Sequence, residues 1–597
     1  MSHSRSTTNL LIYLLLATAC RAQAVITYHV SPHVADKTFH IRIDIPTVRE
    51  REPTVRLQMP VWMPGDYSVQ DFALGVTNVS AFAAGRTRIP LRVFHPDPNT
   101  WEVAANGRRS VSVEYTVKNP DMEMNGSSPR RAHLVGSATY MYIVDHKQDP
   151  VLLQIDPPDG VKEWPVICSL DPVEAKPRAY RAPNYDVLAD APVEMGDFVD
   201  ETFVAGGKPH HVVLYGDYKT IDHPKLTEYC RRIAETEIAL FGEAPFERYV
   251  FEFASTSRLG GGSEGGLEHA ASTEIGPLGQ VTVGVRSVIA HEYFHLWNVK
   301  RIRPFVLGPF NYVNPPHTAN LWWAEGVTDY YADVLLHRGG MYDQKTFLGT
   351  ISFTISMMQN SRARSEISAD ESSLRTWEDN SEGGFGGVSY YTRGELIGLC
   401  LDLKIRNASG GRASLDDVMR ALLKHCHNGN GPGFGEDDIK ETVNRVSGKN
   451  LSEFYDLVAR STDDLPFEEC LGYAGLTLER TEPPTQEVDS GMHIQFNTAL
   501  NQILVLRVFP GGPAEKAGIE AGDRITATNG DTDWHKYVSA VMSAKPGTNV
   551  NLSLLRGSEH KTVEITLGSL NRYAWKIGIN SSAKKAEVAL RNSWLGR

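Results

Sequence analysis

The sequence predicts a multidomain α+β protein, and three features of the 597-residue chain lead to that prediction. The chain is longer than one hydrophobic core supports, so about three or four domains are expected. Residues 25 to about 190 alternate apolar and polar side chains, as half-buried strands do. From about residue 199 the apolar spacing becomes mainly helical, and alternating strands return near the C-terminus.

The N-terminus has the pattern of a secretory signal peptide. Arg5 precedes an apolar run over residues 10–19, and residues 22–24 read A-Q-A, which fits the A-x-A form of a cleavage site. This run is too short to span a bilayer. We expect residues 1–24 to be removed and the mature chain to be periplasmic or secreted, without a transmembrane span. Lipid anchoring at Cys20 is the alternative.

Composition excludes some partners and some kinds of site. The formal net charge is −12 and no basic block occurs, which argues against nucleic acid or an anionic membrane as the main partner. The five cysteines after Cys20 are widely and irregularly spaced, so they form neither a disulfide framework nor a cysteine-based metal site. Buried free thiols are expected for most of them, and one disulfide stays open.

Residues 25–195 are expected to form an antiparallel β-sandwich. Apolar and polar side chains alternate clearly over residues 39–45 and 111–117, and proline and glycine mark the turns. Within this domain, residues 62–67 read W-M-P-G-D-Y. This segment has the composition of a turn with buried aromatic side chains, and we assign it no chemistry.

His291 and His295 are the first and last residues of an H-E-x-x-H motif on a predicted helix. Positions i and i+4 of a helix share one face, so both imidazoles can point the same way. Apolar residues precede the motif, which favours a buried helix over a surface helix with two unrelated histidines. Glu292 can take a proton from a metal-bound water. Glu325, from a second segment, completes the two-histidine, one-glutamate set of an open catalytic zinc site. Asp329, one helical turn further on, is placed to orient a ligand imidazole. The sequence therefore predicts a Zn²⁺ site.

Two segments also carry a family resemblance. Residues 291–304 (H-E-Y-F-H-L-W-N-V-K-R-I-R-P) and 323–331 (W-A-E-G-V-T-D-Y-Y) resemble the glycyl aminopeptidase family of zinc metallopeptidases. This implies a thermolysin-like α/β zinc-peptidase domain with a helical C-terminal part over residues 196–465. It also implies a PDZ domain over residues 466–570, followed by a tail over residues 571–597. The activity implied is hydrolysis of small N-terminal residues, such as Gly or Ala, from peptides.

The resemblance extends to a glycine-rich segment. Residues 265–269, G-G-L-E-H, are similar to a strand of zinc aminopeptidases whose glutamate binds the free α-amine of the substrate. Glu268 would then pair with the ammonium group, and Gly265 and Gly266 would let the backbone approach the peptide closely. A mobile loop with a solvated glutamate is the alternative.

A tyrosine that follows is similar to another family residue. Tyr391 begins Y-T-R-G, which is similar to the Y-x-K-G that opens a helix in related zinc aminopeptidases. The tyrosine hydroxyl there hydrogen-bonds the tetrahedral oxyanion, which is a favourable electrostatic contribution. Tyr390 is the neighbouring candidate, and an ordinary packing tyrosine is the remaining alternative.

The last domain resembles a peptide-binding module. Residues 509–525 are similar to the S-P-A-x-x-A-G-L-x-x-G-D-x-I stretch of bacterial PDZ domains, which bind the C-terminal carboxylate of an extended peptide. Residues 471–476 are a candidate carboxylate loop. Two other functions stay open: a zinc endopeptidase with the same centre, and a peptide-binding protein on an inactive protease scaffold.

Overall fold

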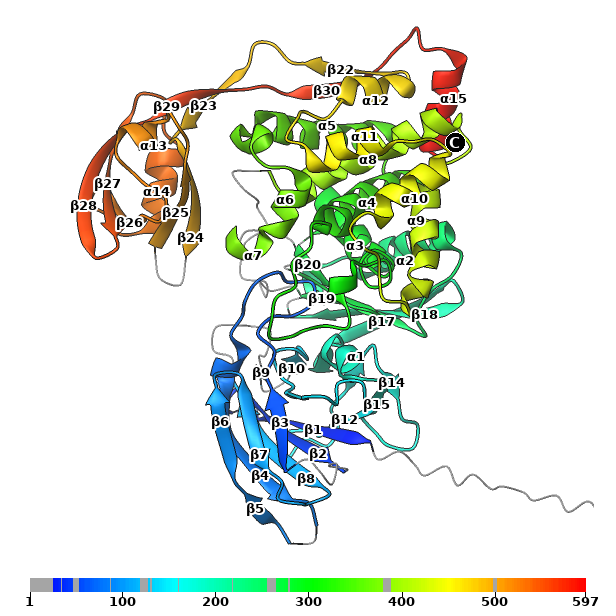
Figure 1. Ribbon diagram of the computed structural model, residues 1–597, viewed down its shortest axis with the longest axis vertical. Coiled ribbons are helices and arrows are strands. Elements are labelled where there is room, and N and C mark those ends of the chain that lie inside the picture. The colour runs from blue at the N-terminus through cyan, green and yellow to red at the C-terminus, as the bar shows by residue number, and fades with distance from the viewer. Residues whose placement is uncertain are drawn as a thin grey trace, which may run out of the picture.

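A computed structural model of the protein describes residues 25–596 except 34, 47–52, 86, 119–126, 129–130, 159, 217, 255–264, 277–279, 380–387 and 498–501. The predicted signal peptide, including Cys20, lies outside the described residues. Figure 1 shows a β-rich N-terminal part in blue, a helical body in green and yellow, and a small β-rich unit that an extended ribbon joins to the body. This is the multidomain α+β architecture that the sequence predicts.

The N-terminal part contains the predicted sandwich. One sheet has the order β14 (Asp171–Pro172), β15 (Ala179–Ala182), β12 (Val151–Ile155), β1 (Ile26–His33), β2 (Thr38–Ile45), β8 (Val111–Val117), β4 (Val76–Ala83) and β5 (Ile89–Leu91). A second has the order β11 (Tyr142–Ile143), β3 (Thr54–Gln58), β7 (Thr100–Ala104) and β6 (Val93–Asp97). Strands β1 and β12 run parallel, so the larger sheet is not wholly antiparallel. Buried residues alternate along β1 and β8, and both sheets close one apolar core.

Two further sheets meet where the N-terminal part joins the body. The first has the order β13 (Val166–Cys168), β16 (Val193–Gly196), β10 (Arg131–Leu134) and β9 (Ser127–Ser128), with α1 (Tyr185–Ala189) close by. The second has the order β17 (Val199–Ala205), β18 (Lys208–Tyr215), β19 (Tyr249–Ala254), β21 (Ser272–Gly276) and β20 (Gly265–Glu268). Helix α2 (His223–Phe241) crosses over between the parallel strands β18 and β19.

The body is helical, as predicted. Its helices are α3 (Val283–Phe294), α4 (Val327–Arg338), α5 (Gln344–Asn360), α6 (Ala369–Leu374), α7 (Thr376–Asp379), α8 (Tyr390–Ser409), α9 (Leu415–His425), α10 (Asp438–Ser447), α11 (Ser452–Tyr455) and α12 (Phe467–Tyr473). Side chains of Thr282, Asp343 and Ser389 cap α3, α5 and α8 by accepting backbone N–H bonds. These helices and the sheet that contains β19 share one large apolar core. Among the described residues, no helix has the length and apolarity needed to cross a bilayer.

The small C-terminal unit has its own core and is reached by a two-stranded ribbon. Its sheet has the order β24 (Met492–Asn497), β25 (Gln502–Val508), β26 (Arg524–Thr528), β27 (Asn549–Arg556) and β28 (Glu559–Thr566), packed with α13 (Pro513–Lys516) and α14 (Trp534–Tyr537). The ribbon pairs β22 (Leu476–Arg480) with β30 (Trp575–Ile579) and β23 (Thr485–Asp489) with β29 (Gly568–Arg572). The chain thus leaves the body and returns to it.

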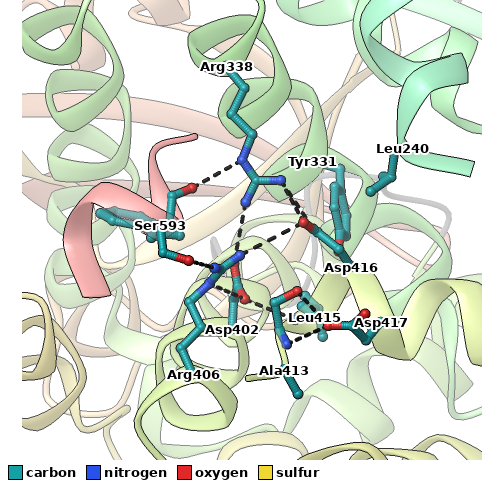
Figure 2. A network of polar contacts seen from close by, with 12 residues as sticks. Leu240, Tyr331, Arg338, Asp402, Arg406, Ala413, Leu415, Asp416, Asp417 and Ser593 are labelled. Carbon is teal, nitrogen blue, oxygen red and sulfur yellow. Dashed lines mark hydrogen bonds and ion pairs between the residues drawn. The ribbon is translucent and has the colours of Figure 1, made fainter. Parts of the chain in front are cut away.

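The returning segment differs from the predicted tail over residues 571–597. It forms β30 and α15 (Lys585–Trp594), and the Trp594 indole donates to the Tyr330 hydroxyl at 2.9 Å. Figure 2 shows Ser593 of α15 beside Arg406 and Arg338, in a buried network with Asp402 and Asp416. The sequence of α15 looks like a polar tail because only its last residues are buried.

The candidate carboxylate loop at residues 471–476 is wrong. These residues end α12 and begin β22, and Leu471 and Leu476 lie in the core of the helical body. The five described cysteines, by contrast, are free and buried, as predicted.

Candidate metal centre and active site

Helix α3 brings the two motif histidines together. His291 and Glu292 lie in its last turn, and His295 is the C-cap with helical backbone angles, so both imidazoles project from one face. The two Nε2 atoms lie 2.9 Å apart, and both rings are buried. The local helix geometry alone therefore points both nitrogens at one position.

Glu325 reaches the same position from a π-helical turn, η5 (Trp322–Gly326), that leads into α4. One of its carboxylate oxygens, Oε2, is 3.4 Å from His291 Nε2 and 3.2 Å from His295 Nε2. The π-helical turn adds one residue to the regular helix, as often occurs at functional sites. Burial alone would raise the pKa of Glu325, but the two histidines hold it well below its usual range.

The other nitrogen of each ring is already paired. His291 Nδ1 lies 2.7 Å from Asp329 Oδ1, and His295 Nδ1 lies 2.7 Å from the Asn298 carbonyl oxygen. A carbonyl oxygen only accepts, so His295 Nδ1 carries a proton and the neutral ring keeps its lone pair on Nε2. Two such lone pairs and a carboxylate oxygen repel one another unless a cation lies among them. This donor set fits Zn²⁺ with an open fourth position.

Glu292 lies beside this group under a strand that carries glycine. A Cβ on Gly266 of β20 would overlap the Glu292 carboxylate, so only glycine allows the strand to pass so closely. Burial raises the pKa of Glu292 to about 7; His291 and His295 oppose that rise, and Glu268 and Glu325 add to it. A carboxyl with a pKa near neutrality is suited to accept and return a proton.

Glu268 ends β20 and is buried next to the centre. Its carboxylate, one from Glu292 and a His295 nitrogen have ligating atoms within 4.8 Å of one another. Lys300 Nζ lies 3.8 Å from Glu268 Oε1 and 3.1 Å from Asp190 Oδ1. Gly265 precedes Gly266 in the same edge strand. The structure thus places Glu268, Gly265 and Gly266 at the centre.

Tyr391 and Tyr390 lie in the first turn of α8 and differ in environment. The Tyr391 ring is 6.1 Å from the His291 ring, centroid to centroid, and is half-buried. The Tyr390 hydroxyl lies 3.2 Å from Thr376 Oγ1, and its side chain is fully buried. The geometry therefore favours Tyr391 over Tyr390 as the group that faces the centre. The first turn of α8 lies close to η5 because Gly326 and Gly394 face each other, where a Cβ on either would overlap backbone atoms.

Tyr67 is a site residue that the sequence did not reveal. It comes from the W-M-P-G-D-Y segment of the N-terminal part, and its hydroxyl donates to Glu325 Oε1 at 3.0 Å. In the same turn, Gly65 has φ +99°, and a Cβ there would lie 2.6 Å from Glu268 Oε2. The turn composition was readable, but nothing local indicates that it reaches Glu325.

A cavity of about 470 Å³ opens beside Glu268, between the N-terminal part and the body. Aromatic and charged side chains line it, among them Trp62, Tyr67, Lys300, Arg303 and Phe310. A chamber of this size next to a buried carboxylate suits a small organic ligand.

Three stretches of the chain match known domains. Residues 27–197 match the Peptidase M61 N-terminal domain, residues 284–397 match M61 glycyl aminopeptidase, and residues 490–567 match a PDZ domain. An aminopeptidase N family protein from Idiomarina loihiensis has a similar solved structure, with 26% identity and a TM-score of 0.78 over 96% of this chain and 100% of that chain. An M1 zinc metallopeptidase from Deinococcus radiodurans aligns with 14% identity and a TM-score of 0.45 over 74% of this chain and 95% of that chain, which is too distant to bear on activity.

Curated relatives match over short stretches only. A probable periplasmic serine endoprotease DegP-like from Rhizobium meliloti is 30% identical over 101 residues, which are 17% of this chain and 19% of the relative. The periplasmic pH-dependent serine endoprotease DegQ from Escherichia coli is 42% identical over 65 residues, which are 11% of this chain and 14% of the relative. The chain spans less than a fifth of the length of these relatives. The three domain matches and the full-length structural match establish that the chain carries the M61 N-terminal, M61 glycyl aminopeptidase and PDZ domains of an M61-type metallopeptidase.

Proposed function

We propose that the protein is a zinc-dependent aminopeptidase in which His291, His295 and Glu325 hold the ion. The convergence of these three ligand atoms beside Glu292 and Glu268 carries the proposal. When bound, zinc supplies Lewis-acid activation of a water molecule and of the scissile carbonyl. Asp329 and the Asn298 carbonyl fix the two imidazoles through Nδ1 and so present Nε2 to the ion.

The remaining roles belong to side chains around the centre. Glu292 accepts a proton from the attacking water and returns it to the leaving amine, as its position beside His291, His295 and Glu325 allows. The Tyr391 hydroxyl donates to the developing oxyanion. Glu268 pairs with the α-ammonium group of the substrate. Gly265 and Gly266 have no side chains, so the backbone of a peptide can approach the strand closely. A preference for small first residues such as Gly and Ala is proposed on the family match alone.

The domain boundaries and the cellular location belong to the same proposal. We assign residues 1–24 to a signal peptide, 25–195 to the N-terminal domain, 196–475 to the catalytic domain and 490–567 to the PDZ domain, and we expect a periplasmic or secreted enzyme. Residues 466–475, which the family resemblance assigns to the PDZ domain, pack in the core of the body. Strand β24 is an edge strand of the PDZ sheet, so a peptide C-terminus can add to it.

The amine-anchor role is tested by comparing a free-amine peptide with its N-acetylated form, using metal-analysed protein and a panel of chromogenic amino acid amides. We expect cleavage of the free-amine peptide only, and a loss of about 100-fold in kcat/KM for E268Q. Equal rates for both peptides would contradict the role of Glu268 as the amine anchor.

The role of Tyr391 is tested separately. Y391F should lower kcat by about 100-fold with little change in KM, and Y390F is its matched control.

One observation favours a second function, a zinc endopeptidase. Lys300 already lies 3.8 Å from Glu268, so part of the anchor's charge is balanced within the protein. The acetylated peptide distinguishes the two functions, because an endopeptidase cleaves it and an aminopeptidase does not.

A further inference from the structure

A second cluster of ligating side chains lies outside the proposed active site, between the N-terminal part and the body. It consists of two cross-strand pairs: His133 opposite Glu194 on β10 and β16, and Glu252 opposite Glu274 on β19 and β21. His133, Glu194 and Glu252 are fully buried, and Glu274 nearly so. Since residues opposite each other on neighbouring strands project to the same face, each pair presents its polar groups to the other sheet.

The two sheets face each other across this cluster. His133 Nδ1 lies 3.1 Å from Glu194 Oε2, and His133 Nε2 lies 2.8 Å from Glu274 Oε1 on the opposing sheet. A small apolar cluster draws residues from both sheets, among them Ile167 of β13 and Val250 of β19, and its Tyr215 ring lies 6.4 Å from the His133 ring, centroid to centroid. Arg131 Nε, 2.8 Å from Glu194 Oε1, is a positive group at the rim of the cluster.

Glu252 is the residue whose carboxylate has no ion-pair or hydrogen-bond partner among the described residues. Its side chain is fully buried, and neither carboxylate oxygen accepts a hydrogen bond from the part of the chain that the structure describes. It is also directly opposite another glutamate, an arrangement that destabilises a sheet unless the charge is neutralised. A buried carboxylate without a partner costs several kcal/mol, so such a group calls for a cation or a proton.

We propose that His133, Glu194 and Glu252 bind a second divalent transition cation that joins the N-terminal domain to the catalytic domain. One ligating atom from each residue lies within 4.8 Å of the others, the same separation that groups the active-site ligands. Two ligands of one tetrahedral ion lie about 3.4 Å apart, so the side chains must close by up to about 1.4 Å to form the site.

The ligand chemistry selects the kind of ion. His133 would bind through Nδ1, which lies 3.1 Å from Glu194 Oε2, while Nε2 lies 2.8 Å from Glu274 Oε1, a carboxylate that can orient a ligand imidazole. One imidazole with two carboxylates suits Zn²⁺ or Mn²⁺ better than Mg²⁺ or Ca²⁺, which take oxygen ligands. The site does not depend on the proposed peptidase function.

Metal counting on the full-length protein tests this site. Chelator-treated wild type, E252Q and E237Q are dialysed against Zn²⁺ or Mn²⁺ alone, and bound metal is measured by elemental analysis. Glu237 is the matched control: it is buried on α2 with both oxygens unpartnered, yet it belongs to none of the ligating groups found among the described residues. We expect E252Q to bind one ion fewer than wild type and E237Q the same number as wild type, with peptidase activity unchanged in E252Q.

Equal metal counts in wild type and E252Q would overturn the proposal and would mean that Glu252 holds a proton. Should E252Q fail to fold, the active-site ligand variant E325Q decides: its unfolding midpoint must rise when Zn²⁺ or Mn²⁺ is added to the chelated protein. No rise in E325Q would overturn the site. Absence of peptidase activity in zinc-loaded wild type, together with a rise in E325Q, would contradict only the proposed function.

Discussion

Gly266 is the residue at which the active site tolerates the least change. Any Cβ there overlaps the Glu292 carboxylate, so a substitution must displace the proposed proton acceptor or the strand that carries Glu268. We predict that G266A lowers kcat by about 100-fold, because a displacement of about 1 Å at the reacting groups has that effect. The measurement is steady-state kinetics on a small amino acid amide, with the unfolding midpoint recorded alongside.

The matched control is G349A in helix α5. Nothing lies within 4 Å of a Cβ at Gly349, so alanine there should leave activity unchanged and stabilise the helix by about 0.5–1 kcal/mol. A wild-type kcat in G266A would show that a Cβ at position 266 fits without displacing Glu292 or the strand.

Tyr67 links the N-terminal domain to the proposed metal ligand Glu325. Its buried hydroxyl donates to Glu325 Oε1, so its loss frees the carboxylate to rotate away from the two imidazoles. We predict that Y67F weakens zinc binding by about 10–100-fold, measured by competition with a chromogenic chelator. Y28F removes a hydroxyl bonded to the Met141 carbonyl in the same domain, so it should reduce stability but not zinc affinity. Equal zinc affinity in wild type and Y67F would contradict the link.

The residues of the centre divide into those that sequence spacing reveals and those that it cannot. His291, Glu292 and His295 lie within one turn of one helix, and Asp329 follows Glu325 by another, so helical geometry alone brings each set together. Tyr67 lies 258 positions from Glu325, and only the packing of two domains joins them. Tyr391 and Glu268 could be assigned from family resemblance, but not from periodicity.

At the scale of elements, a row of buried charges connects the N-terminal part to β20. His269 Nδ1 lies 3.0 Å from Asp190 Oδ1, and Asp190 also pairs with Lys300, which approaches Glu268. Burial alone would lower the pKa of His269, but its contacts with Asp190 and Glu274 outweigh that effect and raise it to about 9. The contact is therefore strongest when His269 is protonated.

This shift predicts a pH-dependent stability. A raised pKa means that the stabilisation is complete below the unfolded-state pKa of about 6.5 and disappears as the pH rises through about 9. We predict that H269Q is less stable than wild type by on the order of 2 kcal/mol at pH 6 and that this difference largely disappears at pH 10. Thermal unfolding at both pH values measures it, with H560Q, at an exposed strand position of the PDZ unit, as the control. A difference independent of pH would contradict the assignment.

Elements with strong periodicity could be predicted, and elements defined by tertiary contact could not. Strands β2 and β8 and helices α8 and α9 follow their sequence patterns. The π-helical turn at η5 has no sequence signature, because one extra residue per turn leaves apolar spacing ambiguous. The parallel pairing of β1 with β12 joins strands more than 100 residues apart, which local pattern does not specify.

At the scale of the whole molecule, the PDZ unit is an insertion rather than an appendage. Strands β22 and β30 pair where the chain leaves the body and returns to it, and α15 then lies on the body (Figure 1). Trp594 of α15 is fully buried against Phe347 and Tyr330. The sequence suggests a tail there because a single buried tryptophan in a polar segment gives no periodic signal. Helix α15 and Leu595 are thus part of the helical body.

This arrangement predicts opposite outcomes for two deletions that both remove the PDZ unit. Asp489 and Gly568 are paired across β23 and β29, so a short Asn-Gly turn can join them and omit residues 490–567. That variant retains β30 and α15, and we expect its body to keep the wild-type unfolding midpoint and its activity on small amides. Truncation after residue 489 also removes Trp594, and burial of a tryptophan contributes about 3–5 kcal/mol, so this variant should unfold at a markedly lower temperature. Calorimetry on both variants measures the unfolding midpoints. Equal midpoints would mean that α15 adds nothing to the body, and an unstable turn variant would mean that the PDZ unit itself supports it.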